Sequence, residues 1–227
     1  MFEGFSQETG DFLWELSFHN ERPWFLAHKE QFLRVLDAPF KALGADCLAL
    51  MRQRLPEREL RLHVSRIYRD ARRLFGRGPY KDHLWFILYE GDKHENGPCF
   101  WFELGAATYS YGMGFWEATP SQTEAYRRLI DANPAAFERL IRPIEAKKYR
   151  LYGAEYKRPK AQREPPVSRW YNRRSLSVGM EKDFGGDALS ERLPLLVADC
   201  FEELLPLYDF LWAAFRAAKA ADAEERF

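Results

Sequence analysis

The sequence lacks several features that would assign it to a class of proteins. No apolar run approaches the roughly 20 residues needed to span a bilayer, so we expect no membrane association. The N-terminal stretch is acidic, without a basic segment followed by an apolar one, and predicts no signal peptide. The three cysteines, Cys47, Cys99 and Cys200, are widely spaced and form no C-x-x-C pair. Together these absences favour a reduced, cytoplasmic protein.

Familiar motifs of catalysis and cofactor binding are missing as well. The five histidines show neither H-E-x-x-H nor a zinc-type spacing with cysteine, so no metal site is expected. The segment GRGPYK, which ends at Lys81, lacks the Gly-x4-Gly-Lys-Ser/Thr spacing of a phosphate-binding loop. There is no Gly-x-Ser-x-Gly nucleophile elbow either. We therefore expect no cofactor, and nucleophilic catalysis is disfavoured.

Charge is balanced overall but unevenly distributed. The 34 basic and 34 acidic residues give a formal net charge of zero, which argues against bulk attraction to nucleic acid. Between residues 52 and 81, however, ten basic residues accompany three acidic ones, and between residues 147 and 174 ten accompany two. Two basic segments can form one positive surface if they meet in space.

The hydrophobic pattern predicts an α+β fold. Apolar residues recur at helical spacing over 6–55, 120–146 and 189–220. Alternation with a period of two predicts a sheet over 61–116, and residues 147–180 read as a basic loop and a strand formed by Trp170-Tyr171 and 176–178. The prediction is one domain over 1–227, an antiparallel sheet of about four to six strands with N-terminal, middle and C-terminal helices packed on it.

One stretch of the predicted sheet carries charge that a protein core does not need. Alternation from Arg61 places Arg66, Tyr68 and Asp70 on one strand face and Arg69 on the other. An Arg66 side chain enclosed at one end must be paired, because an uncompensated buried charge costs on the order of several kcal/mol. Asp70, or Glu103 on a neighbouring strand, is the candidate partner. The alternatives are a structural salt bridge and a guanidinium that receives a ligand carboxylate or phosphate.

The candidate ligand-binding residues lie in this stretch or shortly after it. They are Arg66, Tyr68, Arg69, Arg72, Tyr80 and Lys81. Arg73 and Arg77 are interpreted as solvated surface charges. Farther along, Gly112 and Gly114 make a strand face small enough for a close neighbour, for which we expect a packed helix.

Three fragments carry a resemblance to a known family. They read FLWELSFHNERPWF, RIYRDARRLFGRGPYK, and GMGFW followed by YRRLI. They resemble the conserved family known as domain of unknown function 2461, whose members tend to read Asn-Asn where this chain has His19-Asn20. They also tend to read Arg-Phe where it has Arg72-Arg73-Leu74-Phe75. The resemblance implies an intracellular α+β domain and carries no activity with it.

Three functional hypotheses remain open at this level. The first is a cytoplasmic domain that binds a small phosphate- or carboxylate-bearing ligand through Arg66, Arg69 and Lys81, with Tyr80. The second is an enzyme acting on an anionic substrate, with Asp70 or Glu103 as acid or base and the arginines as electrostatic stabilisers. Nearby arginines would lower the pKa of either carboxyl, which favours ion pairing over proton transfer. The third, ranked last, is nucleic-acid binding through segments 52–81 and 147–174. The sequence indicates no oligomeric state.

Overall fold

The computed structural model describes residues 1–70, 72, 74, 76–91 and 97–224. Arg73 and His94 therefore lie outside the described residues. The chain divides into two units, the first made of residues 1–89, 101–111 and 181–199 and the second of residues 90–100, 112–180 and 200–227. The predicted α+β fold class is confirmed. The single domain over 1–227 stays a prediction.

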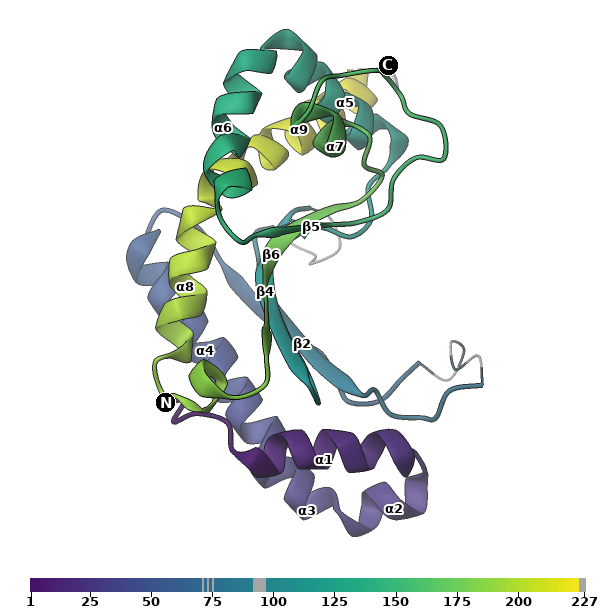
Figure 1. The fold of residues 1–227 in the computed structure, drawn as a ribbon, viewed down its shortest axis with the longest axis vertical. Coiled ribbons are helices and arrows are strands. Elements are labelled where there is room, and N and C mark those ends of the chain that lie inside the picture. Colours follow the sequence, from purple (N-terminus) through teal and green to yellow (C-terminus); the bar gives the residue numbers. More distant parts are fainter. Residues whose placement is uncertain (71, 73, 75, 92–96, 225–227) are drawn as a thin grey trace. The chain divides into compact units, whose positions relative to one another are not determined.

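Helices fill the N-terminal part of the first unit, as predicted (Figure 1). They are α1 (Gln7–Phe18), α2 (Arg22–Ala27), α3 (Lys29–Phe32), the π-helical turn η1 (Leu33–Asp37) and α4 (Ala38–Arg54). The buried Thr9 hydroxyl donates to the Val35 carbonyl at 2.7 Å, which satisfies a carbonyl where the helical hydrogen-bond period changes. Arg54, at the end of α4, pairs with Asp199 of α8 (Leu193–Glu203) at 2.6 Å.

The six strands pair antiparallel in the order β1-β2-β3-β4-β6-β5. Their bounds are β1 (Arg61–Val64), β2 (His83–Tyr89), β3 (Cys99–Gly105), β4 (Thr108–Phe115), β5 (Arg150–Tyr152) and β6 (Leu176–Asp183). In the first unit, the fully buried rings of Phe40, Phe86 and Phe102 join α4 to the sheet, with centroids 5.3 to 6.0 Å apart. A short 3-10 turn, η3 (Gly186–Leu189), follows β6.

The second unit contains the middle and C-terminal helices. They are α5 (Pro120–Ala132), α6 (Pro134–Ala146), α7 (Val167–Tyr171) and α9 (Leu205–Glu224), and α9 packs against α5 and α6 (Figure 1). The prediction of a strand at Trp170-Tyr171 is wrong, because both residues lie in α7. The Trp170 ring is buried 6.2 Å from Phe137 of α6, and its Nε1 donates to Glu145 at 2.7 Å. The strand predicted at 176–178 is confirmed as part of β6.

The close neighbour of Gly112 and Gly114 is strand β6, and the expected helix is wrong. A Cβ atom added to Gly112 would lie 2.0 Å from the Val178 carbonyl oxygen, and one added to Gly114 would lie 2.3 Å from that of Leu176. Any side chain at these positions would push the β6 backbone away. Glycine is therefore required by the approach of β4 to β6.

We expect the substitution Gly112→Ala to lower the free energy of unfolding by about 1–3 kcal/mol, the usual cost of overpacking a well-packed interior. Gly105→Ala is the matched control, because its added Cβ would have its nearest neighbour at 3.5 Å. Urea denaturation of the two variants and the native chain measures the difference. Equal stability of the two variants would contradict the argument.

Candidate functional site

The strand that leads into the predicted site ends earlier than its alternation suggests. β1 pairs with β2 as far as Val64 opposite Phe86. The Ser65 backbone N–H still donates to the Trp85 carbonyl at 2.8 Å, but the Trp85 N–H donates to the Ser65 side-chain oxygen at 3.0 Å. A side chain that takes the place of a backbone acceptor competes with the sheet ladder. The predicted strand is therefore wrong beyond Val64.

Beyond this point two extended segments form the candidate site. Residues 65–70 and 79–82, named here the basic arm, meet at an isolated antiparallel bridge between Tyr68 and Tyr80. The Arg69 N–H donates to the Pro79 carbonyl and the Lys81 N–H donates to the Ile67 carbonyl, both at 2.8 Å. These two bonds hold the segments together although the regular ladder has ended.

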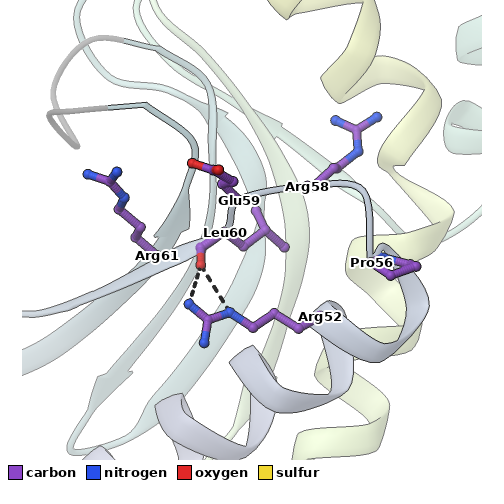
Figure 2. Close-up of a pocket in the computed structure, with 6 residues that line it drawn as sticks. All are labelled: Arg52, Pro56, Arg58, Glu59, Leu60 and Arg61. Carbon is purple, nitrogen blue, oxygen red and sulfur yellow. Dashed lines mark hydrogen bonds between the residues drawn. The ribbon is translucent and has the colours of Figure 1, made fainter.

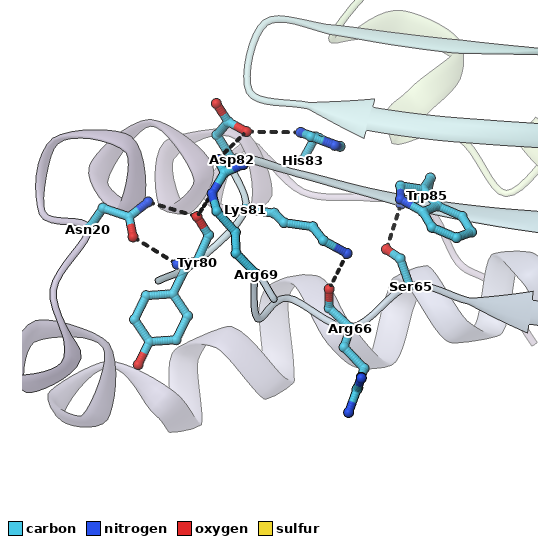
Figure 3. A network of polar contacts seen from close by, with 9 residues as sticks. All are labelled: Asn20, Ser65, Arg66, Arg69, Tyr80, Lys81, Asp82, His83 and Trp85. Carbon is cyan, nitrogen blue, oxygen red and sulfur yellow. Dashed lines mark hydrogen bonds and ion pairs between the residues drawn. The ribbon is translucent and has the colours of Figure 1, made fainter. Parts of the chain in front are cut away.

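Asn20, between α1 and α2, fixes the basic arm from the helical side. Its side-chain oxygen accepts from the Tyr80 N–H at 2.9 Å, and its amide donates to the Tyr80 carbonyl at 3.0 Å (Figure 3). A Cβ atom on Gly78 would lie 2.2 Å from the same side-chain oxygen, so this approach requires glycine. The contact spans sixty positions of the sequence.

The guanidinium of Arg69 makes two polar contacts within the arm. Its Nε donates to the Tyr80 carbonyl at 2.7 Å and a terminal nitrogen donates to Asp82 Oδ1 at 3.1 Å, with the side chain only 12% exposed. Burial by itself would raise the pKa of Asp82. The hydrogen bond from His83, with the charges of His83 and Arg69, more than offsets burial and holds this pKa below its usual range. These contacts indicate that Arg69 stabilises the arm, and its role as a ligand-binding residue stays a prediction.

Tyr80 and Lys81 are also held by neighbours. The buried Tyr80 ring stacks on Phe25 with centroids 4.0 Å apart. The Lys81 amine donates to the Arg66 carbonyl at 2.8 Å and lies 5.5 Å from the centre of the Trp85 ring. Burial lowers the pKa of Lys81, and the positive charges of Arg69 and Arg66 lower it further. Lys81 is thus repelled by two neighbouring cations.

Arg66 and Tyr68 lie on the solvent side of the arm. The expectation that Arg66 is enclosed is wrong, because Ser65 and Ile67 take the buried positions and Arg66 is exposed. Within the described chain its guanidinium makes no hydrogen bond or ion pair, and Figure 3 shows it directed away from the bonded residues. Tyr68 is 52% exposed and packs one side of its ring against Phe25.

The two predicted carboxylates have different surroundings. Arg72 binds Asp70 with two guanidinium nitrogens, at 3.0 and 2.8 Å, and its backbone N–H adds a third bond at 3.0 Å. This hydrogen bond and the charge of Asp70 raise the pKa of Arg72. Glu103 is half-buried on β3, where it makes no hydrogen bond or ion pair with any described residue. An acid–base pair of Asp70 and Glu103 therefore lacks geometric support.

A second group of arginines lies between α4 and β1. Arg52, Arg58 and Arg61 line a hollow of about 480 Å³ together with Pro56, Glu59 and Leu60 (Figure 2). Two nitrogens of Arg52 donate to the Leu60 carbonyl, at 3.2 and 2.8 Å. Figure 2 shows the three guanidinium groups directed to different sides, so they do not converge on one anion.

Four of the ten basic residues of the later segment pair with carboxylates of the second unit. The ion pairs are Lys147–Glu203 at 2.7 Å, Arg169–Glu145 at 3.1 Å, Arg173–Glu155 at 3.0 Å, and Arg163–Asp131. The two basic segments belong to different units. The ion pairs weaken the case for a nucleic-acid surface on segment 147–174.

Other chemistries find little support in the part of the chain that the structure describes. No group of three or more His, Cys, Asp or Glu side chains there is placed to hold a metal ion. No described helix combines the length and apolar character needed to cross a membrane. Burial raises the pKa of Cys99 to about 12 and raises that of Cys47 as well, so neither thiol is activated as a nucleophile.

Sequence reasoning missed three residues of the site, Asn20, Ser65 and Asp82. Asn20 lies in the first fragment that carries the family resemblance, but nothing in its local sequence indicates a contact with residues 79–82. Ser65 gave a local signal, since serine competes for backbone hydrogen bonds. No pattern in the sequence could place Asp82 against Arg69, because that contact depends on how residues 79–82 return to the arm.

We expect Arg69→Ala to lower the free energy of unfolding by about 1.5–3 kcal/mol, the range for hydrogen bonds made by a charged group. The substitution leaves the Tyr80 carbonyl and the Asp82 carboxylate without this donor. Arg77→Ala, an exposed arginine in the same connection, should change stability by less than about 0.5 kcal/mol. Denaturation by urea tests the pair, and equal effects of both substitutions would refute the structural role of Arg69.

The lowered pKa of Asp82 predicts a pH dependence of stability. A carboxyl whose pKa is lower in the folded state stabilises above its unfolded pKa, about 3.9, and this contribution is lost as pH falls through the folded pKa. Asp82→Asn should therefore be less stable than the native chain at neutral pH, with a gap that closes towards about pH 3. Asp183→Asn, at an exposed position, is the control. A gap that is independent of pH would contradict the prediction.

Comparison with known proteins agrees with the fragments of the basic arm and its surroundings. No match is found among curated proteins. The model of the conserved hypothetical protein family DUF2461 matches residues 8–210, which include Asn20, the whole basic arm and all six strands of the described sheet. Its description names no activity. The match confirms the resemblance, and the chain belongs to the conserved hypothetical protein family DUF2461.

Proposed function

We propose that the basic arm binds a small anionic ligand that carries a phosphate or carboxylate group, with the exposed Arg66 guanidinium as the main contact. The supporting observation is the crowding of positive charge around Lys81, whose pKa is lowered by burial and then by Arg69 and Arg66. The carboxylates of Asp82 and Asp70 are engaged by Arg69 and Arg72. Uncompensated positive charge held in one place attracts anions.

In this proposal the members of the arm divide into two roles. Arg66 supplies the planar fork of donors that matches a carboxylate or phosphate. Tyr68, two residues later and 52% exposed, offers a hydroxyl as a further donor. Arg69, Tyr80 and Asn20 hold the backbone in place, so the ligand does not have to order it. Lys81 adds charge and, through its bond to the Arg66 carbonyl, restrains the residue that binds.

The proposal also places the protein in the cytoplasm. Cys47, Cys99 and Cys200 form no disulfide with any described residue, which is the usual state of cysteine in a reducing compartment. The alternative of an enzyme with Asp70 or Glu103 as acid or base has no comparable support, because Asp70 is held by Arg72.

Binding to Arg66 is tested by titrating the chain with inorganic phosphate, pyrophosphate and citrate at low salt, followed by isothermal titration calorimetry. We expect Arg66→Ala to weaken binding at least tenfold, since a charge-assisted bidentate contact contributes about 1.5–3 kcal/mol. Arg66→Lys keeps the charge but loses the planar fork of donors, so its affinity should lie between those of the native chain and Arg66→Ala. Arg77→Ala should bind as the native chain does.

Two results would overturn the proposed function. One is the absence of binding by all three anions to the native chain. The other is unchanged affinity in Arg66→Ala. Arg66 is exposed, and its hydrogen bond to another described residue is made by its backbone carbonyl, so the substitution should leave the thermal midpoint unchanged. A loss of binding without a loss of stability therefore identifies a contact with the anion.

A further inference from the structure

The second unit contains a hollow that the proposed function does not use. It has a volume of about 470 Å³ and is lined by Trp116, Glu117, Ala118, Arg174 and Ser175, where β4 ends and β6 begins. Phe115, the last residue of β4, is buried with its ring 5.2 Å from that of Phe215. The next residue, Trp116, is 77% exposed. A tryptophan exposed at a hollow offers a large flat apolar surface to a ligand.

Two opposite charges line the same hollow without meeting. The side chains of Glu117 and Arg174 are exposed, and neither makes a hydrogen bond or ion pair with another described residue. The neighbouring Arg173 behaves differently, since it pairs with Glu155 at 3.0 Å and its side chain is only 11% exposed. The hollow thus presents a cation and a carboxylate that pair with no described residue, together with an exposed aromatic side chain.

Both sides of the hollow are fixed by hydrogen bonds from backbone N–H groups. On one side the Arg174 N–H donates to the Ala154 carbonyl at 2.7 Å, and the Ala154 N–H donates to the Ser175 hydroxyl at 2.9 Å. On the other side, Thr119 and Gln122 form a reciprocal capping box at the start of α5, with bonds of 2.8 and 3.2 Å. The cap already satisfies N–H groups of this helix end, which leaves Arg174 as the group for an anion.

We propose that this hollow binds a free mononucleotide, with the base stacked on Trp116, the phosphate on Arg174 and a ribose hydroxyl or exocyclic amine donating to Glu117. Stacking on an aromatic side chain accepts any base, because every base has a π-face. A guanidinium pairs with phosphate through two parallel bonds, and a carboxylate accepts from hydroxyl and amine groups. The volume lies within the roughly 300–1,000 Å³ typical of small-ligand sites. A single tryptophan fits one base, so the proposal is for a mononucleotide. It goes beyond the proposed function, since it concerns a different unit and needs a base as well as an anion.

The test uses the full chain labelled with 5-fluorotryptophan and observed by fluorine NMR. Of the seven tryptophan signals, that of Trp116 is the one missing in Trp116→Phe. Titration with AMP, GMP, CMP and UMP should shift this signal saturably, most strongly with the two purines. In Arg174→Ala the dissociation constant for AMP should rise at least tenfold. Adenosine and ribose 5-phosphate, each lacking one half of the ligand, should bind at least tenfold more weakly than AMP.

The controls separate recognition from general effects of charge and from the basic arm. Lys148→Ala removes an exposed cation of the same unit that makes no described ion pair, and should bind AMP as the native chain does. Trp14→Phe removes an exposed tryptophan of the first unit and should leave the Trp116 signal responsive. Because the readout is the Trp116 signal, anion binding at Arg66 can fail while this test succeeds, and the reverse also holds.

Three outcomes would overturn the inference. The first would be a Trp116 signal that does not move with any of the four monophosphates at concentrations on the order of 10 mM. The second would be an equal response of the Trp116 signal when AMP is added to Arg174→Ala, or when ribose 5-phosphate is added to the native chain, as when AMP is added to the native chain. The third would be binding of a single-stranded pentauridylate at least tenfold more tightly than UMP, which would assign the hollow to nucleic acid instead of a free nucleotide.

Discussion

The guanidinium of Arg69 is the contact on which the basic arm depends. The regular ladder ends where the Ser65 side chain takes the Trp85 amide, so residues beyond it need other partners. Arg69 provides them by bonding to the Tyr80 carbonyl and Asp82, while Asn20 binds both polar backbone groups of Tyr80. Without Arg69 or Asn20, the polar groups of Tyr80 and Asp82 that they bind would lose a hydrogen-bond partner. Leaving a buried polar group without a partner costs more free energy than the hydrogen bond contributes when it is made.

The contact between Arg69 and residues 79–82 also brings Lys81 close to other positive charges. Arg69 returns residues 79–82 to the arm, and Lys81 then lies where Arg66 and Arg69 lower its pKa. Like charges at close range cost stability, and local costs of this kind are concentrated at functional sites. An anion bound at Arg66 would offset this repulsion and so stabilise the arm. In the second unit the reverse situation holds, since Glu117 and Arg174 line one hollow and leave an attraction unused.

Much of the fold followed from periodicity, whereas the details of the site did not. Phe40, Leu43 and Cys47 recur at helical spacing, and all three are fully buried in α4. Short apolar pairs carry no period, so Trp170-Tyr171 could be assigned to a strand although packing against α6 makes it helical. The stretch around Arg66 was recognisable from composition. The roles of its members were not, because Arg69 bonds to a carbonyl eleven residues later and Asn20 acts from sixty residues away.

The early end of β1 has a consequence for the protein in crowded solution. β1 and β5 are the outermost strands of the sheet order, and they contain only four and three residues. An open sheet edge is a template on which a second chain can pair and start to aggregate, and short edge strands limit this. Had the alternation from Arg61 to Asp70 continued as one strand, it would have offered a long unpaired edge. The Ser65 hydroxyl, which accepts a hydrogen bond from the Trp85 amide, thus also limits pairing of the sheet edge with a second chain.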